Sequence, residues 1–188
     1  MFSPDADLFF LSPRTKVDRP NWFGVLYLLR RDIELCMGIN PDTGEAMALW
    51  PGAMAMLAGI DLLAKFFAGC DDGGPGKVGN RFRMFLERFF VGTSSTHRGV
   101  IYQLRNSLLH SFGLYSPNYR FFLTNHGAGA LVSYNPPDRY HVDLRVLHRE
   151  FEKAVAAYCA ALDSDPQHRQ LQANFKAMLG NYGRIHID

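Results

Sequence analysis

The chain has 188 residues, with 20 lysines and arginines against 18 aspartates and glutamates, and 47% of its residues are hydrophobic. This length allows one domain with a substantial core, and the hydrophobic content excludes a disordered chain. The net charge of +2 excludes a protein that coats polyanions over its whole surface. The three cysteines form no CxxC pair and the N-terminus resembles no signal peptide, so we expect a reducing, cytoplasmic location without a zinc site.

Positive charge is concentrated in the middle of the chain. Residues 1–76 hold six basic and ten acidic side chains, residues 77–120 hold seven basic and one acidic, and residues 121–188 hold seven of each. Arginine outnumbers lysine 15 to 5, and arginine is the better bidentate partner of phosphate and carboxylate groups. The middle segment therefore permits an anionic ligand that the total charge does not indicate.

The chain begins with a predicted arm and a predicted helix. Residues 1–17 contain two prolines and are expected to form an irregular N-terminal arm. Asp18 is a suitable N-cap and Pro20 a suitable early-turn residue. Apolar residues at helical spacing over 22–37 then predict a helix that Gly38 ends.

A second helix is expected over about 44–67, with Pro51 as a point where it can kink. Its most apolar stretch, Ala46–Ile60, has 15 residues, which is too short to cross a bilayer. We therefore interpret it as a buried helix and expect no membrane partner.

A third helix is expected over 80–91, where phenylalanines share one face and arginines, among them Arg88, lie elsewhere. Interleaved arginine and phenylalanine side chains can bind nucleic acid through phosphate contacts and stacking. The more common interpretation is an amphipathic helix with phenylalanine in the core and arginine in water.

A fourth helix is expected from Thr93 or Ser94, either of which can cap it, to Phe112, with Gly113 as its stop. Its predicted core face has spacings of 3, 4, 4 and 3 residues and consists of Ile101, Leu104, Leu108, Phe112 and Tyr115.

The period then changes to that of strands. Residues 119–124 and 130–134 are short β-prone runs separated by a glycine-containing turn, which predicts a hairpin, and residues 140–144 can add a third strand. Two further helices follow, one capped by Asp143 and one opened by Asp165 and Pro166.

Together these elements predict a mainly α protein with a single domain over 18–188. We expect an up-and-down four-helix bundle core over 18–113, a small β-hairpin insertion over 118–144 and two C-terminal helices over 145–184.

The fourth helix carries a second face that mixes small, polar and titratable residues, which a merely solvated face seldom needs. Its members are Gly99, Tyr102, Asn106, Leu109, His110 and Gly113. Gly99, Asn106 and Gly113 are each seven residues apart, so another helix can pack closely there. That helix can come from the same chain or from a second copy.

Arg105, Asn106 and His110 are the chemically interesting residues of this helix. Asn106 and His110 are four residues apart and can touch. Arg105 and His110 are five apart, which is about 140° around an ideal helix. Both reach one phosphate only if long side chains curl, the helix distorts or a second subunit completes the site.

Here the sequence resembles the HEPN superfamily, whose catalytic members are ribonucleases built on a four-helix bundle. Its hallmark is an arginine, a polar residue, a short apolar spacer and a histidine, and the run from Arg105 through Asn106 to His110 fits it. The likeness covers about a dozen residues. It leaves the β insertion and the two C-terminal helices unexplained.

The resemblance implies an endoribonuclease that needs no metal or cofactor and works as a homodimer. His110 would be the acid or base for attack of a 2′-hydroxyl on the adjacent phosphate, since histidine titrates near neutrality. Arg105 would stabilise the phosphate charge and Asn106 would position groups. Tyr102, Arg98 and Arg88 are the expected substrate contacts within the basic segment.

The resemblance also fits a toxin or defence protein with an antitoxin partner such as a minimal nucleotidyltransferase. The first alternative is a HEPN-like module that binds a nucleotide or a protein without catalysis. An unrelated helical enzyme is the second.

His148 and Glu152, four residues apart on a predicted helix, could ligate a metal. No third ligand is evident in the sequence, so a solvated helix face is the better interpretation of this pair.

Overall fold

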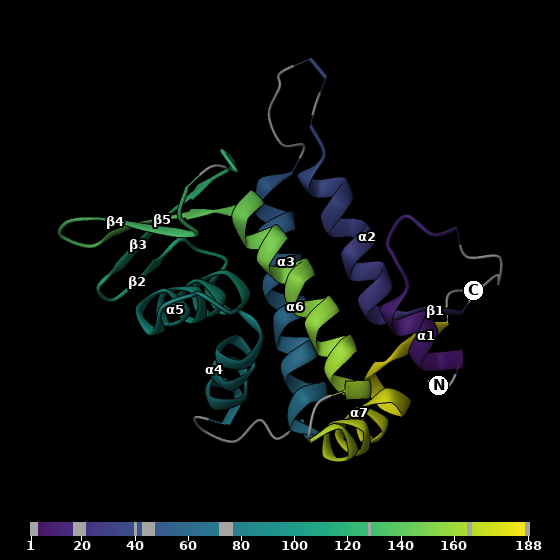
Figure 1. Cartoon of the computed structure of the whole chain (residues 1–188). Coiled ribbons are helices and arrows are strands. Elements are labelled where there is room, and N and C mark those ends of the chain that lie inside the picture. Colours follow the sequence, from purple (N-terminus) through teal and green to yellow (C-terminus); the bar gives the residue numbers. More distant parts are fainter. Residues whose placement is uncertain are drawn as a thin grey trace.

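The computed structural model describes residues 4–16, 22–39, 41–42, 48–71, 77–127, 129–164 and 167–186. Its helices are α1 Pro4–Phe10, α2 Val25–Met37, α3 Leu49–Ala68, α4 Lys77–Phe89, α5 Ser95–Ser111, α6 Leu144–Ser164 and α7 His168–Tyr182. Its strands are β1 Trp22–Gly24, β2 Tyr115–Ser116, β3 Tyr119–Thr124, β4 Val132–Asn135, β5 Arg139–Asp143 and β6 Arg184–His186. The prediction of a mostly helical protein with a small β part is confirmed (Figure 1).

Helix α3 is the central helix, because it contacts α2, α4, α5, α6 and α7. Pro51 lies in its first turn, where a missing backbone N–H leaves no bond unmade, so the helix needs no kink there. The predicted start near residue 44 lies outside the described residues. With 20 residues, α3 is long and apolar enough to cross a membrane, but half of it is buried, as in the core helix of a folded protein.

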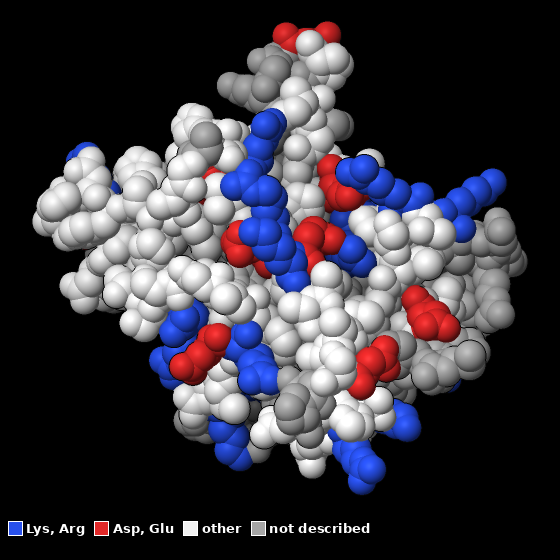
Figure 2. Space-filling model, viewed as in Figure 1, with Lys and Arg blue, Asp and Glu red and all other residues white. Residues whose placement is uncertain are grey.

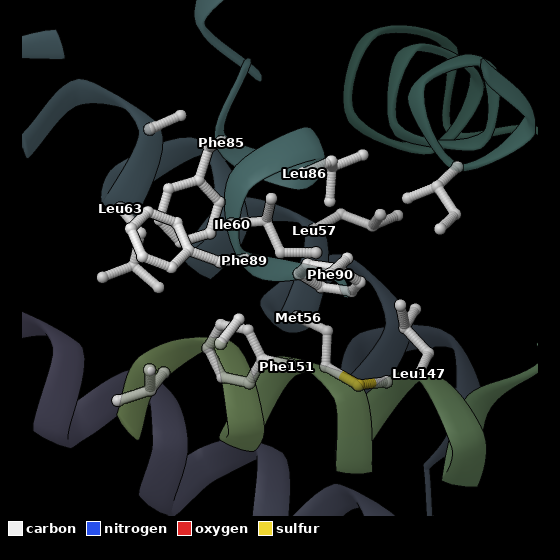
Figure 3. Close-up of a cluster of buried hydrophobic side chains, with 14 of the residues drawn as sticks. Met56, Leu57, Ile60, Leu63, Phe85, Leu86, Phe89, Phe90, Leu147 and Phe151 are labelled. Carbon is white, nitrogen blue, oxygen red and sulfur yellow. The ribbon is translucent and has the colours of Figure 1, made fainter. Parts of the chain in front are cut away.

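The core forms where α4 and α6 pack on α3 (Figure 3). Leu57 and Ile60 of α3, Phe85 of α4 and Phe151 of α6 are fully buried, and each such side chain contributes about 1.5–3 kcal/mol. Gly59 allows the close approach of α6, because a Cβ there would lie 2.9 Å from the Phe151 ring.

The N-terminal segment belongs to this core. Residues 4–10 form α1, and Phe9 is fully buried, with its ring centroid 4.5 Å from that of Phe66 and 5.4 Å from that of Phe175. The expectation of an irregular arm is therefore wrong for these residues. A helix of seven residues is unstable alone, so the burial of Phe9 rather than helix propensity holds α1 in place.

The start of the first predicted helix is also corrected. Trp22 and Phe23 lie in β1, which pairs antiparallel with β6, and α2 begins only at Val25. Gly24 lies against α1, since a Cβ on it would be 2.3 Å from the carbonyl oxygen of Leu8. The expected cap over 18–20 lies outside the described residues.

The four-stranded sheet has the order β2-β3-β5-β4. Strand β5 lies between β3 and β4, pairing in parallel with β3 (Phe121 opposite Tyr140) and antiparallel with β4 (Val132 opposite Val142). The predicted hairpin between 119–124 and 130–134 is therefore wrong, and the hairpin joins β4 to β5. The β insertion also begins earlier than residue 118, because β2 starts at Tyr115.

Two expected helix caps are confirmed, at the starts of α5 and α6, whereas the expected opening of the last helix at Asp165 and Pro166 lies outside the described residues. The hydroxyl of Ser94 accepts a hydrogen bond from the backbone of His97 at 3.2 Å, and Asp143 Oδ1 accepts from the backbones of Arg145 and Val146 at 3.0 and 3.1 Å.

The predicted core face of α5 ends early, since Phe112 is 70% exposed and Tyr115 63% exposed. The physical reason is that the helix ends at Ser111, and Phe112 then adopts a left-handed conformation with φ of 48°.

Candidate functional site

Arg105 and His110 meet within one chain at the C-terminal end of α5. Arg105 Nη1 lies 2.7 Å from His110 Nε2, so the long arginine side chain curls across the last turn of the helix. A guanidinium only donates hydrogen bonds, so Nε2 accepts in this contact and the ring hydrogen is assigned to Nδ1.

Two further oxygens hold the Arg105 guanidinium. Asn106 Oδ1 accepts from Nη1 at 3.1 Å, and Asp61 Oδ2 on α3 accepts from Nη2 at 2.7 Å. Asn106 therefore positions the arginine rather than the imidazole in this structure. Asp61 was not predicted as a site residue, although it and Lys65 are the only charged residues of α3.

The ion pair is buried while the histidine is open to solvent. The Arg105 side chain is 8% exposed and the Asp61 side chain 15% exposed, whereas His110 is exposed. Asp61 Oδ1 and Arg105 Nε are buried without a hydrogen-bond partner among the described residues. His110 is therefore more exposed than either partner of the ion pair.

Tyr102 and Arg98, two of the predicted substrate contacts, have partners outside this cluster. Tyr102 packs against α4, where its ring lies 5.3 Å from the Arg83 guanidinium and its hydroxyl lies 2.5 Å from where a Cβ on Gly79 would be. Arg98 Nη1 donates to the carbonyl of Thr93 at 2.5 Å, at the opposite end of α5. Arg88 is exposed in the last turn of α4.

The glycines of the predicted packing face are open. No described atom lies within 4 Å of where a Cβ on Gly99 would be, and Gly113 meets only backbone atoms of its own loop at 3.7 and 3.9 Å. No helix in the described part of the chain packs on Gly99.

Glu152, which together with His148 formed the possible metal-binding pair, pairs with an arginine in the structure. Arg30 Nε and Nη2 donate to the Glu152 carboxylate at 2.9 and 2.5 Å, so Glu152 holds a buried arginine. Among the described residues, no three histidine, cysteine, aspartate or glutamate side chains group together as metal ligands.

Comparison of the chain with protein families, with curated proteins and with solved structures gave no match. No family is therefore identified for this chain, and the resemblance to the HEPN superfamily depends on the sequence motif alone.

Proposed function

We propose that this protein is a metal-independent endoribonuclease of HEPN type, in which α2, α3, α4 and α5 form the four-helix unit. The observation that carries the proposal is the 2.7 Å contact between Arg105 Nη1 and His110 Nε2. It joins a buried, fixed cation to a solvent-exposed imidazole, which are the two groups that phosphodiester cleavage by a neighbouring hydroxyl requires.

The reaction begins with attack of a 2′-hydroxyl oxygen on the adjacent phosphorus. His110 Nε2 takes the hydroxyl proton, the bond from phosphorus to the 5′-oxygen breaks, and that oxygen takes a proton from water as it leaves. A 2′,3′-cyclic phosphate and a 5′-hydroxyl end result. Arg105 Nη1 donates to a phosphate oxygen and stabilises the charge that develops there.

Substrate itself frees the base in this scheme. Before RNA binds, the lone pair of His110 Nε2 is occupied by Arg105. A phosphate oxygen is a stronger acceptor for a guanidinium than an imidazole, because the hydrogen bond joins opposite charges. When the phosphate takes over Nη1, Nε2 becomes available to the 2′-hydroxyl, while Asp61 keeps the guanidinium in place through Nη2.

The open face of α5 supports a homodimer. A second copy packed on Gly99 and Gly113 would bring two exposed histidines to one cleft, and Arg98 and Arg88 would then contact the RNA backbone. Tyr102, which packs on α4, supports the site structurally in this arrangement. A toxin or defence role with a nucleotidyltransferase antitoxin is consistent with this proposal.

The test is RNA cleavage by the purified protein in EDTA. We expect cleavage by the wild type, loss of cleavage in His110→Ala and full activity in His97→Ala, a matched control in the first turn of the same helix. Equal activity of the His110→Ala variant and the wild type, at equal thermal stability, would overturn the proposal.

One observation favours a second candidate, a HEPN-like module that binds a nucleotide or a protein partner without cleaving RNA. Asp61 already neutralises Arg105 at 2.7 Å, which reduces the charge left for a phosphate. Binding of RNA or a nucleotide that His110→Ala weakens, with no cleavage by the wild type, would establish this candidate in place of the nuclease.

A further inference from the structure

A hollow of about 370 Å³ lies where the end of α2 meets the start of α6, far in sequence from the α5 motif. Its main lining side chains are Arg14, Glu34, Met37, Arg145, His148 and Arg149. In Figure 2, basic side chains form a column over the front of the molecule, where Figure 1 places α6, with acidic side chains beside it. This volume lies in the range of small-ligand pockets.

The hollow carries excess positive charge. Arg14 Nε is 3.3 Å from Glu34 Oε1, so this pair is neutral. Arg149 Nη1 donates to the carbonyl of Gly127 at 2.7 Å, which leaves its charge uncompensated, and the Arg145 guanidinium has no ion-pair partner among the described residues. Two positive charges therefore remain on neighbouring turns of α6.

His148 supplies a polar atom that needs a partner. Its Nε2 is buried and has no hydrogen-bond partner within the described residues, and such buried polar atoms are rare. Burial lowers the pKa of His148 below its usual 6.5, Arg30 lowers it further, and the carboxylates of Glu152 and Glu34 oppose this shift. Because Nε2 is covered in this structure, the ring must turn before an N–H there can donate to an anion in the hollow.

We infer that this hollow binds a phosphomonoester, with the phosphate held by Arg145, Arg149 and His148. Two arginines and an imidazole match the two charges and several acceptor oxygens of a phosphate dianion, whereas a phosphodiester carries one charge. Met37 offers an apolar contact to the rest of the ligand. The site shares no residue with the Arg105 cluster and is independent of the nuclease proposal.

Calorimetry with AMP, inorganic phosphate and adenosine tests the site and its ligand. We expect AMP to bind and adenosine not to bind. Affinity for inorganic phosphate equal to that for AMP would identify the free ion as ligand, and weaker affinity would identify a phosphorylated nucleoside-like molecule. Equal binding of adenosine and AMP, or binding of neither AMP nor phosphate, would overturn the inference.

Variants and competition locate the binding. Arg145→Gln with Arg149→Gln should reduce AMP affinity at least 10-fold, whereas Lys153→Gln, one turn further on α6 and paired with Glu150, should not. Displacement of AMP by an RNA oligonucleotide with a 5′-hydroxyl end would mean that the hollow holds phosphodiester backbone, contrary to the inference.

If the double variant does not fold, an NMR titration of the wild-type protein still tests the site. On addition of AMP, the imidazole NMR signals of His148 should shift while those of His97 stay. Absence of a His148 shift, or an equal shift of both histidines, would also overturn the site.

Discussion

Asp61 Oδ2 on α3 lies 2.7 Å from Arg105 Nη2 on α5, and both side chains are largely buried. The arginine that we propose as the phosphate ligand is therefore also a structural residue. Removing one partner of a buried ion pair leaves the other charge uncompensated, which costs about 3–5 kcal/mol. Stability and activity are coupled at this residue, so its variants need both measurements.

Asp61→Ala should lower the free energy of unfolding by about 3 kcal/mol, measured by urea denaturation. The double variant Asp61→Leu with Arg105→Met should be more stable than Asp61→Ala, because it leaves no charge unpaired. Arg14→Ala, which breaks an exposed pair with Glu34, is the control and should change stability little. An Asp61→Ala protein as stable as the control would contradict the buried-pair account.

Gly59→Ala tests how closely α6 packs on α3. The new Cβ would lie 2.9 Å from the Phe151 ring, so the ring must move, and overpacking of this kind costs about 1–3 kcal/mol. Gly180→Ala on α7 is the matched control, because no described atom lies within 4 Å of its new Cβ and alanine favours a helix. The melting temperature should fall in Gly59→Ala and rise in Gly180→Ala, relative to the wild type. A Gly59→Ala protein that melts no lower than the wild type would contradict this packing.

Gly99→Leu tests the proposed dimer. The described chain has open space at Gly99, so leucine should be accommodated in the monomer. If a second copy packs on this face, the larger side chain should convert the dimer to a monomer, as measured by light scattering after size-exclusion chromatography. A wild-type protein that is already monomeric, or a variant with unchanged dimer mass, would exclude this interface.

His148 should make the folded protein less stable as the pH falls. Its pKa in the folded protein is lowered by burial, so between that value and 6.5 the unfolded chain binds more protons than the folded one. The contribution of His148 to the free energy of unfolding is therefore fully present above pH 6.5, and it is lost as the pH falls toward the pKa of the folded protein. Arg30 and Glu34 of α2 and Glu152 of α6 act electrostatically on the ring and remain in His148→Gln. This variant should unfold with a weaker dependence on pH between 7 and 5; an unchanged dependence would contradict the assignment.

Most helices could be predicted from the sequence, and the motif could be recognised in it, because both depend on local spacing. Asp143 was identifiable as a cap from residue type, whereas residue type left Thr93 and Ser94 both open at the start of α5. Helix α1 was missed because its stability comes from Phe9 packing on Phe66 and Phe175, which no local pattern reports. The strand order was missed because alternation indicates which face of a strand is buried and not which strand lies beside it.

Only part of the candidate site around Arg105 could be identified from the sequence, because only some of its residues are close to one another along the chain. Arg105, Asn106 and His110 are close in sequence, but Arg105 and His110 meet only because the long arginine side chain curls across the last turn of the helix. Asp61 lies 44 residues away, and its only signal was a carboxylate within an apolar helix, which requires a buried partner that sequence does not name.

The most direct test of the nuclease proposal is the chemistry of the ends that the protein produces. A mixed-sequence RNA pool and the same pool with 2′-O-methyl groups are incubated with the protein in EDTA, and the products are analysed by mass spectrometry. We predict 2′,3′-cyclic phosphate and 5′-hydroxyl ends from the RNA, and no cleavage of the methylated pool or by His110→Ala. Cleavage of the methylated pool, or no cleavage of either pool by the wild type, would contradict the proposal.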